Sequence, residues 1–250
     1  FIQFAESKIL KDDWSPDAVY GHAKRLSLFD DALVCTKTLY NYIELGIMRV
    51  KNIDLPMKVR LNTKKKRCRK NKRILGRSIE ERPIEVNGRN EFGHWEIDTV
   101  IGKKTNDEAL MTLTERKTRK EFIIRVPAKD SEAITKAISC LKNTFDSRFS
   151  NIFKTITSDN GSEFADLDFS VNDVQTDIYF THPYSSCERG TNERHNGLIR
   201  RFIPKGKAIS SVSEATILYA ETWCNQLPRK ILAYKTPEEC FQEELALLPS

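Results

Sequence analysis

Residues 92–102, FGHWEIDTVIG, decide which fold we expect for the chain. Apolar residues at Trp95, Ile97 and Val100 make this stretch strand-like, and Gly102 ends it. Asp98 lies inside the run, although aspartate is disfavoured in strand interiors and is rarely buried without a partner. The stretch therefore predicts a β-strand that carries an acid whose presence needs a chemical reason.

Strand and helix patterns alternate after this stretch. Two β-rich runs, 110–114 and 121–126, flank the polar turn ERKTRK and predict a hairpin. The pattern then predicts a helix over 130–148, a short strand within IFKTITSDNGSEFA (152–165), a strand within TDIYFTHPY (176–184) and a long helix in SSCERGTNERHNGLIRRFI (185–203). This succession predicts an α/β core.

Three carboxylates stand out in this core. Asp98 lies in the first strand, Asp159 lies where a later strand gives way to an Asn-Gly turn, and Glu193 lies on the last helix. Carboxylates hold Mg²⁺ together with waters and substrate phosphates, and two such ions about 3.5–4 Å apart can drive phosphoryl transfer. The alternative is structural: a partnered acid at Asp98, a turn residue at Asp159 and a solvated helix position at Glu193.

The helix that carries Glu193 also carries candidate phosphate-binding side chains. Arg189, Asn196 and Arg200 lie four residues before, three after and seven after Glu193, so they share its helix face. The helix leads into RRFIPKGK, where Lys205 adds another cation along a candidate nucleic-acid path.

Two short helices are expected before the core. Ser15 is a plausible N-cap before Pro16 in the stretch 14–27. The stretch 36–46 repeats this pattern, with Thr36 as the expected cap and Gly46 as the helix end. Such a pair is compatible with a helix-turn-helix, although any small helical hairpin looks alike. The candidate DNA contacts on the second helix are Lys37, Tyr40 and Asn41.

The net charge of +6 is concentrated in one segment. Residues 58–77 hold 11 Lys and Arg and no acid, whereas residues 1–57 carry −1 and residues 78–250 carry −4. A run of like charges resists burial and marks a linker or arm, which either binds a polyanion or is a plain tether. Its candidate DNA-binding residues are Lys64, Lys65, Lys66, Arg67, Arg69 and Lys70.

Composition excludes several protein classes. A hydrophobic fraction of 39% over 250 residues is enough for a folded core and makes global disorder unexpected. No apolar run approaches the length of a transmembrane helix, and the first residues show no secretory signal. The six cysteines form no CxxC pair, which favours free thiols in a reducing cytosol over disulfides or a zinc site.

Three blocks, GHWEIDTVIG, SDNGSEFA and HPYSSCERGTNERHNGLIRRFIPKG, resemble the IS30 (IS-thirty) family of bacterial insertion-sequence transposases. That resemblance implies a ribonuclease H-like catalytic domain similar to retroviral integrases. It makes Asp98, Asp159 and Glu193 the family's DDE triad, each a metal ligand, separated by 60 and 33 residues. WSPDAVYGHAKR and TKTLYNYI look like the family's helical DNA-binding region, and LPRKILAYKTPEECF resembles its closing segment.

The resemblance implies a metal-dependent transposase that uses Mg²⁺ or Mn²⁺ to cleave element ends and to join the freed 3′-hydroxyls to target DNA. Its implied partners are the double-stranded terminal repeats, the target DNA and further copies of the chain, in the bacterial cytoplasm and associated with the nucleoid. The alternatives are a non-catalytic DNA-binding regulator derived from a transposase and a metal-dependent nuclease with the same fold.

Two positions depart from the family pattern, which has a small residue where Ile97 stands and commonly Lys where Ser162 stands. The family also implies a further N-terminal helix-turn-helix upstream of Phe1. The expected organisation is a helix-turn-helix-like region (1–57), a basic arm (58–90), the ribonuclease H-like core (91–212) and a C-terminal helical segment packing on that core (213–250).

Overall fold

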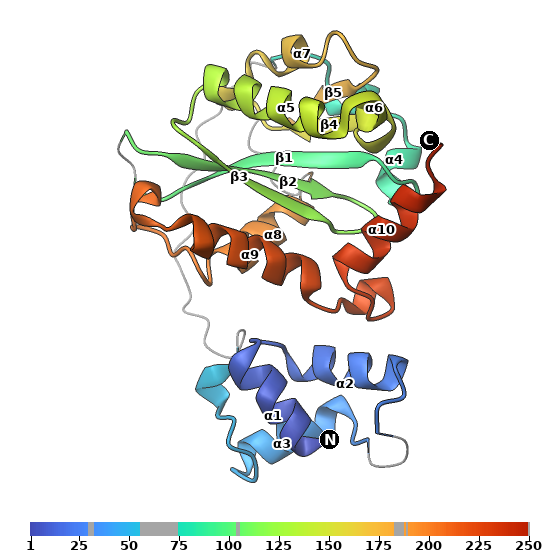
Figure 1. The fold of residues 1–250 in the computed structure, drawn as a ribbon, viewed down its shortest axis with the longest axis vertical. Helices are drawn as coiled ribbons and strands as arrows, with labels where there is room; N and C mark the ends of the chain where they lie inside the picture. Colours follow the sequence, from blue (N-terminus) through green and yellow to red (C-terminus); the bar gives the residue numbers. More distant parts are fainter. Residues whose placement is uncertain (30–32, 56–74, 104–105, 183–187, 189, 250) are drawn as a thin grey trace. The chain divides into compact units, whose positions relative to one another are not determined.

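The computed structural model describes residues 1–29, 33–55, 75–103, 106–182, 188 and 190–249, except the side chain of Glu193. Its contacts divide the chain into two compact units. The helical unit comprises Phe1–Arg67 and Gln226–Cys240, and the sheet unit comprises Cys68–Asn225 and Phe241–Ser250 (Figure 1). Among the described residues, no helix is long and apolar enough to cross a membrane.

Five strands form one mixed sheet in the order β3-β2-β1-β4-β5. They are β1 (His94–Ile101), β2 (Ala109–Glu115), β3 (Glu121–Val126), β4 (Thr155–Ser158) and β5 (Asp177–Phe180). The first three strands pair antiparallel, which confirms the predicted hairpin, whereas β1 pairs with β4 and β4 with β5 in parallel. This mixed sheet, with helices between its strands, confirms the α/β core that the sequence predicted.

Helices cover both faces of the sheet (Figure 1). One face packs against α5 (Ser131–Phe145) and its neighbours α6 (Phe149–Ile152) and α7 (Leu167–Ser170), and the other is covered by α8 (Gly190–Ile199) and α9 (Glu214–Gln226). The remaining α-helices of the described regions are α1 (Ile2–Lys11), α2 (Pro16–Arg25), α3 (Thr36–Glu44), α4 (Glu85–Gly88) and α10 (Pro237–Leu247). Short 3-10 helices span Asn52–Asp54, Ile79–Glu81, Asp146–Arg148, Ser162–Phe164, Ile209–Ser211 and Lys230–Leu232.

Alternation along β1 separates an apolar face from a polar one. Trp95 and Ile97 are fully buried in the main core, where the Trp95 ring stacks on Phe153 at 4.6 Å and on Phe122 at 5.3 Å. The indole Nε1 donates to the Ile152 carbonyl at 2.7 Å, so the one polar group of this core residue is paired. The alternate residues point to the opposite face, which α8 covers.

The helical unit packs α1, α2 and α3 around a core of its own. Ser15 caps α2 as predicted, because its side chain accepts a hydrogen bond from the Ala18 amide at 3.2 Å. The predicted cap of α3 is wrong: Cys35 holds the N-cap position without a side-chain bond, and Thr36 is the first helical residue. Gly46 follows the end of α3 with a φ of +70°, a left-handed conformation that glycine adopts without strain.

The C-terminal segment differs from the expectation that all of 213–250 packs on the core. Residues 226–240 group with the helical unit instead. The Tyr234 hydroxyl donates to Asp17 at 3.2 Å, and Arg25 pairs with Glu239 at 2.9 Å. These partners are more than 200 residues apart in the chain, so no local sequence pattern reveals them.

Candidate catalytic site

The sheet sets Asp98 and Asp159 on neighbouring parallel strands. β1 and β4 pair His94 with Thr155 and Glu96 with Thr157. Continued by two residues, the same register brings Asp98 beside Asp159, just past the end of β4. Neighbouring strands lie about 4.8 Å apart, a separation at which two carboxylates can share a cation. The register therefore sets the backbones of two of the three predicted acids side by side in the middle of the sheet.

Hydrogen bonds orient both carboxylates. Asp98 accepts from the Thr99 amide and from the Asn196 side-chain amide, each at 2.8 Å. Asp159 accepts from the Gly161 amide at 2.9 Å, within the predicted Asn-Gly turn. Both side chains are half-buried, so they are oriented by the protein and still reachable from solvent.

Helix α8 lies over the same face of the sheet, where Asn192 bonds Glu96 and Asn196 bonds Asp98. Glu193 belongs to the turn of α8 between these two contacts, but its side chain lies outside the described residues. Within the described part of the chain, no group of three His, Cys, Asp or Glu side chains could hold a metal ion. The meeting of all three acids therefore stays a prediction, while Asp98 and Asp159 supply the oxygen ligands that Mg²⁺ prefers.

Glu163 is a buried acid of this region that no sequence pattern singled out. Its side chain is only 4% exposed. One carboxylate oxygen accepts from the Thr99 hydroxyl and pairs with the Lys129 ammonium, both at 2.9 Å. Glu163 thereby links the residue after Asp98 to the turn after Asp159, and the spacing of four residues from Asp159 was its only sequence signal.

Three buried arginines bond residues that lie close in sequence to the predicted acids. Arg116 pairs with the fully buried Glu96 at 2.5 Å, Arg119 donates to Thr191 at 3.1 Å, and Arg82 donates to Thr157 at 2.9 Å. Burial lowers the pKa of Arg82 and of Arg119 to about 10, so both guanidiniums stay charged at neutral pH. No sequence pattern marks these arginines, because their burial depends on partners far away in the chain.

Of the DNA contacts predicted on α8 and just after it, two bond the sheet and one is exposed. Asn196 contacts Asp98, and Arg200 donates to the Ile101 carbonyl at 2.7 Å, in a half-buried position where burial lowers its pKa. Lys205 is exposed, and Arg189 lies outside the described residues. Asn196 and Arg200 thus hold α8 against β1, and their contact with DNA stays a prediction.

The candidate contacts on α3 share one exposed face. Lys37, Tyr40 and Asn41 are all exposed, whereas Leu39 and Ile43 are buried in the helical unit, as the pattern predicted. Spacings of three and four residues keep the exposed trio on one side of the helix. The six predicted contacts of the basic arm, residues 64–67, 69 and 70, lie outside the described residues.

Comparison with known proteins gives several similar sequences. The chain is 41% identical over 224 residues to the probable transposase for insertion-like sequence element IS1161 of Streptococcus salivarius, covering 88% of this chain and 62% of that protein. It is 36% identical over 241 residues to the transposase for insertion sequence element IS4351 of Bacteroides fragilis, covering 94% and 71%. It is 32% identical over 249 residues to the transposase InsI for insertion sequence element IS30A of Escherichia coli K12, covering 95% and 63%.

Other comparisons add less. No family model matches the chain. Among solved structures, the catalytic core domain of BIV integrase is similar at a TM-score of 0.47 and 16% identity, covering 62% of this chain and 97% of that one. The chain spans less than two thirds of the length of the Streptococcus salivarius protein. The sequence matches nevertheless extend over both units, and the chain belongs to the IS30 family of insertion-sequence transposases.

Proposed function

We propose that the protein is a DNA transposase that cleaves the ends of an insertion sequence and joins the 3′-hydroxyls to target DNA by metal-dependent phosphoryl transfer. The observation that carries this proposal is the register that sets Asp98 beside Asp159 on parallel strands under α8. The three relatives described above are named as transposases of insertion elements, which supports the same reaction class.

In this proposal Asp98, Asp159 and Glu193 hold two divalent cations, Mg²⁺ or Mn²⁺. Such ions activate an attacking oxygen and stabilise a leaving one in phosphoryl transfer. The Asn196 amide and the Thr99 backbone hold the Asp98 carboxylate in one orientation, and the Gly161 amide does the same for Asp159. Fixed carboxylates bind cations without reorganising, which favours affinity and a defined geometry.

The proposed partner is double-stranded DNA, both the terminal repeats of the element and the target. In this proposal the exposed face of α3 with Lys37, Tyr40 and Asn41 reads DNA, and the basic arm contacts phosphates. Two element ends must be processed together, so the proposal includes a homodimer or larger multimer on DNA, acting in the bacterial cytoplasm at the nucleoid.

The test uses a duplex that ends in the inverted repeats flanking the coding sequence, with Mg²⁺ present. Asp98→Asn, Asp159→Asn and Glu193→Gln should each abolish nicking and strand transfer while DNA binding stays measurable. The matched control is Glu132→Gln, an equally conservative change of an exposed acid on α5, which should retain activity. Near-normal strand transfer by any one of the three variants would sink the triad assignment.

The products distinguish the alternatives. Binding of the wild-type chain without nicking of any duplex would favour a non-catalytic regulator. Nicking without a product that contains a joined 3′ end would favour a nuclease with the same fold.

A further inference from the structure

The buried face of α8 is polar. Four of its described side chains are buried, and three of these, Thr191, Asn192 and His195, are polar; the fourth is Ile199. A surface helix normally attaches to its domain through an apolar stripe. The position of α8 on the sheet is therefore set largely by hydrogen bonds, which are directional, rather than by apolar packing, which tolerates sliding.

A ladder of contacts runs along β1. Asn192, Asn196 and Arg200, one helical turn apart, bond Glu96, Asp98 and Ile101 in the same order. Between the first two of these contacts, four helical residues rise about 6 Å and two strand residues, Glu96 to Asp98, advance about 6.6 Å, so these two spacings nearly match. These three contacts therefore fix the position of α8 along the direction of β1.

Glu96 anchors the beginning of this helix. Its carboxylate accepts from the Asn192 amide at 3.0 Å, one of the first four helical N–H groups, which have no partner inside a helix. Negative charge is favoured at a helix N-terminus, and Arg116 holds the other oxygen of Glu96.

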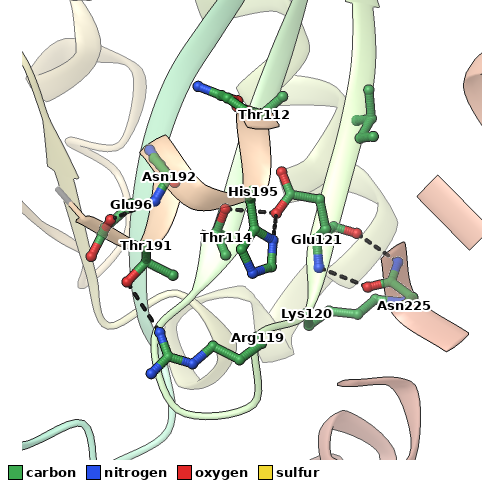
Figure 2. Close-up of polar contacts among 12 residues, drawn as sticks. Glu96, Thr112, Thr114, Arg119, Lys120, Glu121, Thr191, Asn192, His195 and Asn225 are labelled. Carbon is green, nitrogen blue, oxygen red and sulfur yellow. Dashed lines mark hydrogen bonds and ion pairs between the residues drawn. The ribbon is translucent and has the colours of Figure 1, made fainter. Parts of the chain in front are cut away.

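Glu121 anchors the next turn of α8 from a different strand. Its Oε2 lies 2.6 Å from His195 Nδ1 and accepts from the Thr114 hydroxyl, also at 2.6 Å (Figure 2). Glu121 is fully buried, and His195 is only 3% exposed. Asn225 of α9 bonds both the amide and the carbonyl of Glu121 at 2.9 Å, so the backbone that carries the carboxylate is itself held.

We propose that Glu121 is a positioning residue that acts through His195 to fix the rotation of α8, and with it the direction in which the helix presents its Glu193 position. The contacts of α8 to β1 lie along one line, so by themselves they would allow the helix to rotate about that line. The contact to β3 lies off that line and removes this rotation. This inference rests on the proposed function, in which Glu193 completes the metal site.

The test compares two fully buried glutamates. Glu121→Leu removes the acceptor for His195, and His195→Leu removes the same contact from the helix side. The matched control is Glu115→Leu, because the Glu115 carboxylate bonds Gly93, Lys117 and Thr118 and none of its partners lies on α8. Glu121→Gln is the rescue variant, since its amide oxygen can still accept from His195.

Two readouts are measured on the whole chain without DNA. Hydrogen–deuterium exchange should show faster exchange of α8 amides in both test variants, but not in Glu115→Leu or Glu121→Gln. Calorimetric titration with Mn²⁺ should show affinity reduced about 10- to 100-fold in both test variants and restored in Glu121→Gln. If a leucine at position 121 prevents folding, the His195 variant gives the same comparison.

The outcomes separate this inference from the proposed function. Unchanged α8 exchange in the test variants, or equal loosening in Glu115→Leu, would overturn the role of Glu121 in holding the helix. Faster exchange of the α8 amides with unchanged Mn²⁺ affinity would overturn the proposed effect of Glu121 on the Glu193 position. If Asp98→Asn and Asp159→Asn bind Mn²⁺ with unchanged affinity, the proposed function is refuted instead. The hydrogen–deuterium exchange data would still decide whether Glu121 holds α8.

Discussion

At the residue scale, the Trp95 side chain stabilises the sheet unit through both ring packing and a hydrogen bond. Its ring stacks on Phe153 and Phe122, and its indole nitrogen reaches the Ile152 carbonyl. Trp95→Ala should lower the free energy of unfolding by about 3–5 kcal/mol, because it leaves a cavity and an unpaired carbonyl. Urea unfolding measures this change. Phe169→Ala is the control: with 73% of that residue exposed, its loss should stay within about 0.5 kcal/mol.

His182 is the residue whose protonation should respond to its neighbours. The hydrogen bond that Glu188 accepts from His182 Nδ1, at 2.8 Å, is the main reason that the pKa of His182 lies above its usual value, and Glu80, at 3.3 Å, raises it further. The pair should therefore stabilise the fold fully below about pH 6.5, and this contribution should disappear as the pH rises through the raised pKa. An NMR titration of His182 should show a larger fall of its pKa in Glu188→Gln than in Glu80→Gln; equal falls would contradict the assignment.

Single residues were predictable where their signal is local. Asp98 stood out because aspartate is rare inside strands, and Asp159 because it precedes an Asn-Gly turn. Glu96 and Glu121 gave no such signal, since a glutamate in a half-apolar run looks the same whether solvated or buried. Their roles depend on α8, which lies 70 or more residues later in the chain.

Two helices offer a matched test at the element scale. Gly197 lies inside α8 and Gly46 follows α3, and an added Cβ would meet nothing within 4 Å at either place. Gly197→Ala should stabilise the protein by about 0.5–1 kcal/mol, because alanine loses less backbone freedom in a helix. Gly46→Ala should destabilise it by about 1–2 kcal/mol, because its φ is +70°. Thermal unfolding measures both, and effects of the same sign would contradict the argument.

Whole elements were predictable where turn and cap chemistry marked their ends. Ser15 and Pro16 marked α2, and the polar turn between β2 and β3 marked the hairpin. The helix α1 was missed, because it has no side-chain cap and no acid in its first turn. Thr36 was misplaced by one position, a small error since a hydroxyl residue suits both the cap and the first turn.

The charge distribution is a property of the whole molecule. Residues 78–250 carry a net charge of −4, while the excess of cations lies in the arm of residues 58–77. Replacing Lys64, Lys65, Lys66 and Arg67 with Ala should weaken binding to any duplex and flatten the slope of log affinity against log salt by about 3–4. Fluorescence anisotropy across a salt series measures that slope. The control keeps the charge: Lys64, Lys65 and Lys66 changed to Arg should leave the slope as it is, and an unchanged slope in the alanine variant would make the arm a tether.

The return of residues 226–240 to the helical unit means that the chain passes between its two units three times. The helical unit is therefore not a contiguous cassette. A chimera that imports a foreign segment only in place of residues 1–67 would lose Asp17 and Arg25, the partners of Tyr234 and Glu239. An exchange of the whole helical unit between relatives must therefore move two separate stretches of chain together.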